Sequence, residues 1–172
     1  MPYDSVLLYL VNWLTRCLPP TRCYRMKVRL YRLCGFDIAD SCRIVSSAAF
    51  WGSIDLSIGA DTFVGHDFLV IGGTCKVTIA KHVDIGPRVC IAAGTHEIDV
   101  TGDHSAGPGL SRDVVIEDGV WIGAGTTILG GVRIGRKTVV GAGSLVNRDL
   151  PPFTVAVGVP CRPLKRLTEE SH

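Results

Sequence analysis

The most regular feature of the chain is the spacing of its aliphatic residues, which recur at every sixth position between Ile116 and Pro151. Each group of six opens with Ile or Val and usually continues with a small or short polar residue. A period of six fits neither one face of an α-helix nor a simple two-sided strand. It fits a short strand followed by a corner, with three groups completing one coil of a triangular solenoid. The pattern therefore predicts an all-β fold in which the opening aliphatic residues fill a narrow core.

The same register extends toward the N-terminus and gives fifteen opening positions. They are Ile38, Ile44, Phe50, Ile58, Val64, Val70, Ile79, Ile85, Ile91, Ile116, Ile122, Ile128, Ile134, Val140 and Val146. Extra residues follow only the third group of a coil, so all of them leave from one edge of the prism. Gly, Asn and Asp near the group centres are expected to form the corners. We expect a parallel β-helix of five coils at 37–155, starting near residues 38, 58, 79, 116 and 134, with a long loop at 97–115.

Two helices are predicted before the solenoid, as a hairpin at 1–36. The first, at 5–18, ends at Pro19-Pro20 and carries an apolar stripe of Val6, Leu7, Leu10, Trp13, Leu14, Cys17 and Leu18. The second, at 22–33, stops at Gly35 and carries Arg22, Arg25, Lys27, Arg29 and Arg32. The hairpin is expected to cover the open end of the solenoid, because bare strand edges invite unwanted pairing. An alternative is that its basic face also contacts anionic lipid headgroups.

Composition and charge agree with a single domain that carries an appendage. Twenty Gly and only 7% aromatic residues suit a solenoid with a narrow core. A net charge of +2 gives no electrostatic argument for nucleic acid as a partner. The seven Cys form no CxxC pair, their number is odd, and no signal peptide is recognised. These features favour reduced thiols in a cytoplasmic protein.

The strongest candidate for chemistry is His96, the last residue of the group that begins at Ile91. It stands where the long loop leaves the prism, and loops of that length in compact domains are commonly functional. An imidazole has an unperturbed pKa of about 6.5 and can act as a general base. His104, inside the loop, is expected to order the loop or face solvent, and His82, at a corner, is expected to face solvent.

Three stretches, together with the repeat, give the chain a family resemblance: V-W-I-G-A-G at 120–125, G-A-G-S-L-V-N-R-D-L-P-P at 141–152 and V-G-V-P-C-R-P at 157–163. Over about residues 38 to 167 the chain resembles the left-handed β-helix hexapeptide acyltransferases. It is most similar to the galactoside, maltose and Nod-factor O-acetyltransferase branch. The resemblance implies a left-handed coil, acetyl-CoA as co-substrate without a metal, and a homotrimer with active sites between subunits.

The resemblance also assigns roles to individual residues. The family's catalytic His matches His96, which would deprotonate an acceptor hydroxyl that attacks the thioester directly, without an acyl-enzyme. Positions that hold coenzyme A match Ala124, Ala142, Asn147 and Arg148, and Arg162 and Lys165 in a C-terminal tail at 156–172. The Ala side chains would let the pantetheine arm lie along the coils, and the basic residues would bind phosphates. Trp121 is expected to line the cleft.

The chain departs from the sugar-acetylating relatives at two places. Where they have an Asn-aromatic-Asn run, this chain has His66-Asp67-Phe68, so His66 and Asp67 are the expected acceptor contacts. The Arg-rich N-terminal hairpin resembles that of O-acetyltransferases in surface polysaccharide synthesis, which implies a peripheral position at the inner face of the cytoplasmic membrane. The sequence thus predicts an acetyl-CoA-dependent O-acetyltransferase acting on a sugar hydroxyl, in the assembly of bacterial O-antigen, capsule or exopolysaccharide.

Two alternatives stay open at the level of sequence. One is an N-acetyltransferase of a nucleotide-linked amino sugar, although no nucleotide-recognising feature is apparent. The other is a solenoid without catalysis, or with a metal site. His66, His82 and His96 are separated by 16 and 14 residues, close to one coil length, so this spacing permits a zinc site.

Overall fold

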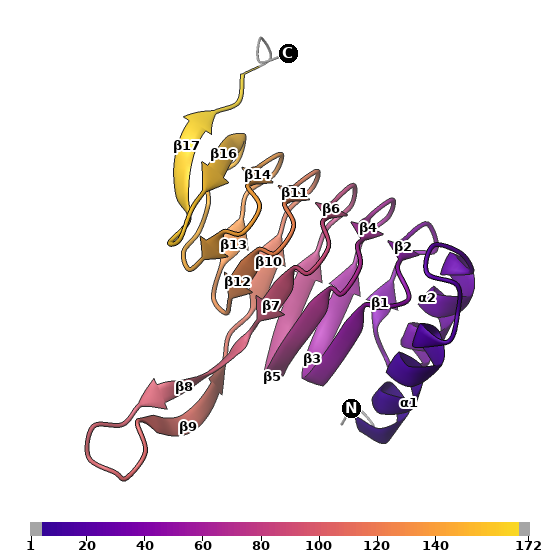
Figure 1. Ribbon diagram of the computed structural model, residues 1–172, viewed down its shortest axis with the longest axis horizontal. Helices are drawn as coiled ribbons and strands as arrows, with labels where there is room; N and C mark the ends of the chain where they lie inside the picture. The colour runs from indigo at the N-terminus through magenta and orange to yellow at the C-terminus, as the bar shows by residue number, and fades with distance from the viewer. Residues whose placement is uncertain (1–4, 169–172) are drawn as a thin grey trace.

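The computed structural model describes residues 5–168 and shows a triangular prism with a pair of helices at one end and an arm projecting from its side (Figure 1). Its first face holds β1 (Asp37–Ile38), the second half of β3 (Ala49–Ile58), the second half of β5 (Leu69–Ile79), β10 (Val114–Ile116) and β13 (Arg133–Ile134). The second face holds β2 (Arg43–Ile44), β4 (Phe63–Val64), β6 (Asp84–Ile85), β11 (Trp121–Ile122), β14 (Val139–Val140) and β16 (Thr154–Val157). The third face holds the first halves of β3 and β5, β7 (Cys90–Ala92), β12 (Thr127–Leu129) and β15 (Leu145–Val146).

The strand register confirms the predicted coils. On the first face, Ile38, Ile58, Ile79, Ile116 and Ile134 lie side by side in parallel strands. All fifteen opening residues are buried, none with more than 2% of its surface exposed. The parallel β-solenoid of five coils is therefore confirmed, and its left hand stays an expectation from the resemblance.

The corners are less uniform than the sequence suggested. Asp61, Asp67 and several glycines adopt the expected positive φ, but His82, Arg88 and Lys137 do so too, at φ of 55–57°. Left-handed backbone is costly for residues with a Cβ, by roughly 1–2 kcal/mol. Backbone hydrogen bonds to the neighbouring coil accompany it, since the amides of these three residues each donate to a carbonyl 2.7–2.9 Å away. The hydrogen bonds between neighbouring coils therefore hold the corners at positive φ even where the residue is one that rarely adopts it.

The helices α1 (Ser5–Arg16) and α2 (Tyr24–Leu33) cover the first coil, as predicted, but begin or end two residues inside the expected limits. Residues 1–4 of the predicted hairpin lie outside the described residues. Aromatic rings fill the junction: Tyr31, Phe36 and Phe50 pack at centroid distances of 4.8–6.3 Å. These rings therefore join the helices to the core of the first coil.

The apolar stripe predicted for α1 does not face the solenoid, although the helix covers the first coil as expected. The structure exposes most of that stripe, with Val6, Leu10 and Trp13 at 52–63% of their surface. The side of α1 that contacts the protein instead carries Leu8, Val11, Asn12 and Thr15, all buried.

One residue of the predicted basic face is also buried. The Lys27 ammonium donates to the carbonyls of Pro19, Pro20 and Ile44 at 2.8–3.2 Å, and burial lowers its pKa. Lys27 therefore ties the turn between the helices to the first coil.

The segment predicted as a loop at 97–115 is largely a β-hairpin. Strands β8 (Gly94–Ile98) and β9 (Ala106–Ser111) pair antiparallel and project from the prism as an arm (Figure 1). At the far end of the prism, β17 (Arg162–Arg166) pairs antiparallel with β16, so much of the predicted tail continues the sheet; residues 169–172 lie outside the described residues.

Candidate active site

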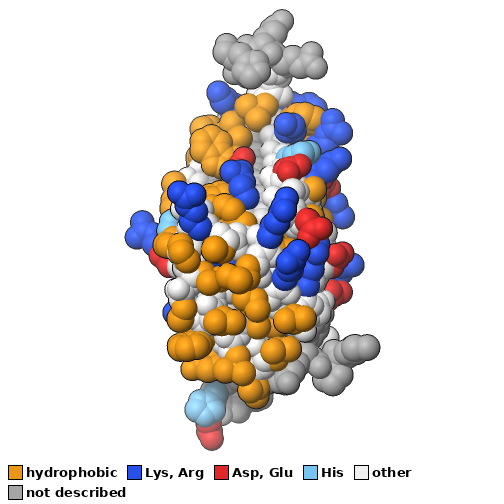
Figure 2. All heavy atoms as spheres, turned by 90° about the vertical axis from the view of Figure 1, so that its right-hand side faces the viewer, with side chains coloured by type: hydrophobic (Ala, Val, Ile, Leu, Met, Phe, Trp, Pro, Cys, Tyr) orange, Lys and Arg blue, Asp and Glu red, His pale blue; other side chains and the backbone are white. Residues whose placement is uncertain are grey.

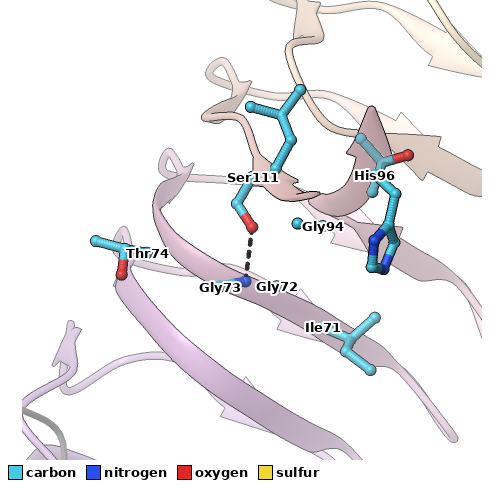
Figure 3. A pocket seen from close by; sticks show the side chains of 10 residues that line it. Ile71, Gly72, Gly73, Thr74, Gly94, His96 and Ser111 are labelled. Carbon is cyan, nitrogen blue, oxygen red and sulfur yellow. Dashed lines mark hydrogen bonds between the residues drawn. The ribbon is translucent and has the colours of Figure 1, made fainter. Parts of the chain in front are cut away.

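The edge between the third and first faces carries the arm, and we call it the arm edge. The arm leaves it between β7 on the third face and β10 on the first. Ser111, at the base of the arm, accepts a hydrogen bond of 2.8 Å from the amide of Gly73 in the preceding coil (Figure 3). A Cβ on Gly94 would lie 3.3 Å from the Cα of Gly72, so glycine allows the arm to lie close against the coil. These contacts fix the root of the arm.

The arm holds the imidazole of His96 in a defined state. Its Nδ1 lies 2.8 Å from the carbonyl oxygen of Gly107 on the opposite strand of the arm. A carbonyl can only accept, so Nδ1 carries the hydrogen and the neutral ring keeps a lone pair on Nε2. The side chain is exposed. His96 can therefore accept a proton at Nε2 from a bound molecule, as a general base must.

Two hollows meet at His96, one on each side of the arm. The first, about 600 Å³, lies against the second coil and is lined by Ile71, Gly72, Gly73, Thr74 and residues of the arm (Figure 3). The second, about 490 Å³, lies toward the fourth coil and is lined by residues that include Ala92, Arg112, Leu129 and Gly130. His96 can therefore contact molecules bound in either hollow.

Sequence reasoning missed the residues that line the first hollow, although a signal for them was present. The extra residues of the second coil lie at the arm edge, and Gly72-Gly73-Thr74 is the irregular stretch there. Ser111, which anchors the arm, carried no pattern that singled it out.

A second edge, between the second and third faces, holds four other predicted site residues, and we call it the alanine edge. Ala124 and Ala142 lie at its corners in successive coils, where the Gly143 amide donates to the Ala124 carbonyl at 2.8 Å. His66 and Asp67 occupy the same edge in the second coil, and both are exposed. Within one chain, therefore, the structure does not bring these four residues to His96.

The remaining predicted site residues lie in three different parts of the structure. Asn147 and Arg148 follow β15 on the arm edge, and Arg162 places Nη1 3.5 Å from the Asn147 side-chain oxygen. Lys165 lies toward the other end of β17, in a separate hollow of about 480 Å³ with Pro151 and Pro152. Trp121 stands 57% exposed on the second face.

The three histidines considered for a metal site do not meet. His82 lies on the edge between the first and second faces, His66 on the alanine edge and His96 on the arm edge. No group of three His, Cys, Asp or Glu side chains suited to a metal occurs among residues 5–168. The zinc site that the spacing permitted is therefore wrong for a single chain, because Ile58 and Ile79 stack at a separation of 21 residues, so histidines 16 and 14 residues apart fall short of a full turn and lie on different edges.

Four of the seven cysteines lie in environments that disfavour a covalent nucleophile. Burial raises the pKa of the Cys42 thiol to about 11 and also raises the pKa values of Cys75, Cys90 and Cys161. A thiol becomes strongly nucleophilic only as the thiolate, which these environments disfavour. This agrees with a transfer that forms no acyl-enzyme on these residues.

Comparison with known proteins identifies the repeat and its relatives. Residues 113–148 match the family described as bacterial transferase hexapeptide (six repeats). The galactoside O-acetyltransferase of Lactococcus lactis subsp. lactis is 33% identical over 134 residues, covering 77% of this chain and 64% of that protein. The chain spans about three fifths of the length of the curated relatives it matches first.

Two solved structures share the fold over almost the whole chain. A hexapeptide-repeat acetyltransferase of Vibrio cholerae O1 biovar eltor, complexed with acetyl coenzyme A, superposes with a TM-score of 0.76 at 26% identity, covering 96% of this chain and 87% of that one. A maltose O-acetyltransferase of Clostridium difficile 630 gives a TM-score of 0.72 at 28% identity, with the same coverage of 96% and 87%. The resemblance found in the sequence is confirmed.

Proposed function

This chain is a hexapeptide-repeat protein related to the galactoside and maltose O-acetyltransferases, and from that premise we propose that it transfers an acetyl group from acetyl-CoA to a sugar hydroxyl. The observation that carries the proposal is the His96 imidazole, whose Nδ1 is committed to Gly107 while Nε2 is left to face a substrate between two hollows. The related proteins supply the chemical class of donor and acceptor.

In the proposed reaction, Nε2 of His96 removes the proton of the acceptor hydroxyl as its oxygen attacks the thioester carbonyl carbon. A carbon–oxygen bond forms, the carbon–sulfur bond breaks, and the leaving thiolate recovers the proton from the imidazolium. The products are the acetyl ester and free coenzyme A. The Nδ1 hydrogen bond to Gly107 holds the ring in one tautomer throughout and stabilises the imidazolium that forms.

We place the complete site between two copies of the chain, in a homotrimer. His96 lies on the arm edge, while Ala124, Ala142, His66 and Asp67 lie on the alanine edge, so one chain does not bring them together. The tip of the arm also exposes Ile98 and Val100, at 85% and 89% of their surface, which suits contact with a neighbour. A cyclic trimer would set the arm edge of each copy against the alanine edge of the next.

In this arrangement the small residues of the alanine edge line the path of pantetheine, beside Trp121. Asn147, Arg148 and Arg162 would bind one end of coenzyme A, and Lys165 a second phosphate, since Arg162 and Lys165 stand opposite Val157 and Val155 on β16. His66 and Asp67 would contact the acceptor. Surface polysaccharide is the acceptor that the resemblance of the N-terminal hairpin favours, in a cytoplasmic enzyme at the inner face of the membrane. The transfer chemistry itself does not need membrane contact.

The decisive experiment measures thiol release from acetyl-CoA with free sugars, lipid-linked oligosaccharides and nucleotide-linked amino sugars as acceptors. His96→Ala should lower kcat/KM by about 10²- to 10⁴-fold with little change in coenzyme A affinity, as expected for loss of a general base. His104→Ala, which alters another exposed histidine of the same arm, is the matched control and should stay near the wild-type rate. Turnover within a few-fold of wild type in His96→Ala would remove His96 as the base, and transfer only to amines would favour the N-acetyltransferase.

Mixing two inactive variants tests the shared site. His96→Ala removes the base, and Ala142→Trp obstructs the alanine edge of the same chain. Co-expressed as mixed trimers, they should recover activity, with about a quarter of sites intact if each site draws on two neighbouring copies. If mixed trimers form but activity does not return, the whole site lies within one chain.

A further inference from the structure

The outer side of α1 is apolar although it faces away from the protein. Val6, Tyr9, Leu10, Trp13 and Leu14 expose 43–63% of their surface along this one helix of twelve residues. Figure 2, which looks onto the helical end of the molecule, shows hydrophobic side chains gathered over its lower part, where Figure 1 places α1. A contiguous apolar surface on a soluble domain usually marks a site of contact.

A buried polar network fixes α1 in this orientation. The Asn12 side-chain amide donates to the Phe50 carbonyl at 2.8 Å, and its oxygen accepts from the Phe50 amide at 3.3 Å. The Tyr31 hydroxyl lies within 3.2 Å of Asn12, Thr15 and the Ala48 carbonyl. Turning the helix to bury its apolar stripe would break the bonds that Asn12 and Thr15 make with Phe50 and Tyr31, so α1 is held with its polar side inward and its apolar side outward.

Basic residues lie beside this apolar surface and outnumber their acidic neighbours (Figure 2). Between Ser5 and Phe36 the sequence holds five Arg, one Lys and no Asp or Glu, whereas the rest of the chain carries a net negative charge. Of the five arginines in this segment, Arg16, Arg22, Arg25 and Arg29 form no ion pair with residues 5–168, and Arg32 pairs with Asp40 at 2.8 Å. A hollow of about 460 Å³ between α2 and the first coil is lined by residues that include Arg25, Arg29 and Arg43, with Asp40 as its acidic member.

We propose that this helical end is a docking surface for an anionic lipid bilayer. α1 lies in the plane of the interface with Val6 and Leu10 toward the acyl chains and Trp13 at the boundary with the headgroups, and the arginines of α2 lie at the lipid phosphates. No helix among residues 5–168 is long and apolar enough to cross a membrane, so the contact is at the surface. Trp and Tyr on the exposed helix suit the headgroup region, since each has an apolar ring and a polar atom.

Charge decides for lipid over a second copy of the chain as the occupant. Two copies meeting through this surface would bring two clusters of unpaired arginines together, and like charges repel at close range. A bilayer rich in acidic lipids supplies phosphates to both. In the proposed cyclic trimer, symmetry gives the three α1 surfaces the same direction along the axis, so three weak contacts would add on one membrane.

Co-sedimentation of the full chain with vesicles tests this proposal. Vesicles of phosphatidylcholine with phosphatidylglycerol should pellet the protein, and pure phosphatidylcholine should do so weakly. Leu10→Ser with Trp13→Ser should lower the partition coefficient by about tenfold or more. Arg25→Gln with Arg29→Gln should lower it by about fivefold for each arginine removed, and raising the salt should do the same to the wild type.

The matched control replaces two exposed lysines outside the hairpin, Lys81→Gln with Lys137→Gln, and should leave vesicle binding unchanged. The emission maximum of Trp13 should shift to shorter wavelength when anionic vesicles are added to the wild type. Trp13→Phe, which lacks this fluorophore, should not show the shift. If both hairpin variants bind the vesicles with the partition coefficient of the wild type, the proposal is overturned. The proposal would also be overturned if Leu10→Ser with Trp13→Ser lowered the oligomeric mass but left vesicle binding unchanged. In that case the surface would join copies of the chain.

Discussion

The prism and helix α1 both repeat apolar residues at regular intervals, but they turn them in opposite directions. In the prism every opening residue, from Ile38 to Val146, points into the core. In α1 the regular stripe points outward, because on the other side Asn12 bonds to Phe50 of the first coil and Thr15 bonds to Tyr31 of α2. The spacing of apolar residues therefore shows which residues share a face of an element. The hydrogen-bond partners of the polar residues determine whether that face points into the core or toward solvent.

The largest expected effect comes from truncating one inward residue of the prism. Ile122 is fully buried beside Ile85 and Val140. Ile122→Ala should lower the free energy of unfolding by about 2–5 kcal/mol, because the packed core cannot close the cavity. Urea unfolding followed by circular dichroism measures it. A loss below about 1 kcal/mol would mean that the stacked coils relax far more than a packed core does.

Alkaline pH should weaken the network that orients α1. Burial raises the pKa of Tyr31 to about 12, above the ordinary value of 10.0. The folded state therefore keeps the phenol proton that the unfolded chain releases, and this stabilisation, present below pH 10, is lost as the pH rises toward 12. The loss attributable to Tyr31 should reach about 2–3 kcal/mol.

Urea unfolding at a series of pH values measures that loss. Tyr31→Phe should be less stable than the wild type at pH 8 but show a flatter decline above pH 10. An identical decline in both proteins would mean that Tyr31 does not titrate with folding.

A smaller effect is expected from the residue that sets the direction of α1. Asn12→Ala leaves the Phe50 carbonyl and amide without their side-chain partner inside the protein. The free energy of unfolding should fall by about 1–3 kcal/mol, the scale for buried polar groups left unsatisfied. Chemical denaturation is again the measurement, and increased protease cleavage near Pro19-Pro20 would show that the helix has loosened.

The smallest effect is expected on the outward stripe. Leu10→Ser should change the free energy of unfolding by less than about 0.5 kcal/mol, since the side chain is half exposed and contributes little to packing. A loss comparable to that of Ile122→Ala would show that the stripe packs inward after all. Together the four measurements separate an apolar face that stabilises the fold from one that is kept for contact.

Much of the solenoid could be predicted from the sequence because each coil repeats the same local demand. The opening residues, the strand register and the edge that carries the arm all follow from where Ile and Val recur and where extra residues are inserted. The pairing of β8 with β9 did not follow, since G-D-H-S-A-G-P-G carries no alternation of apolar and polar residues. The burial of Lys27 was also hidden, because its three carbonyl partners come from the helix turn and from Ile44, distant in sequence.

The candidate site was predictable only in part. His96 stood out because it ends a repeat where a long insertion begins, but its tautomer depends on Gly107, eleven residues away across the arm. That His66 and Ala124 share one edge while His96 lies on another could be read from their places within the groups of six. How two edges meet is a property of the assembly, which a single sequence does not encode locally.

The place where the arm leaves the prism also sets a height. Neighbouring coils stack like rungs at about 4.8 Å, so a root on the third coil stands roughly 10 Å beyond the first. With the helical end resting on a lipid surface, the root of the arm would be held above it by the layer of helices, the first coil and two further coil spacings. The number of coils below the arm would then set the height of the reaction above the membrane. Inserting or deleting one coil would change that height by one coil spacing while leaving the local geometry of the site unchanged.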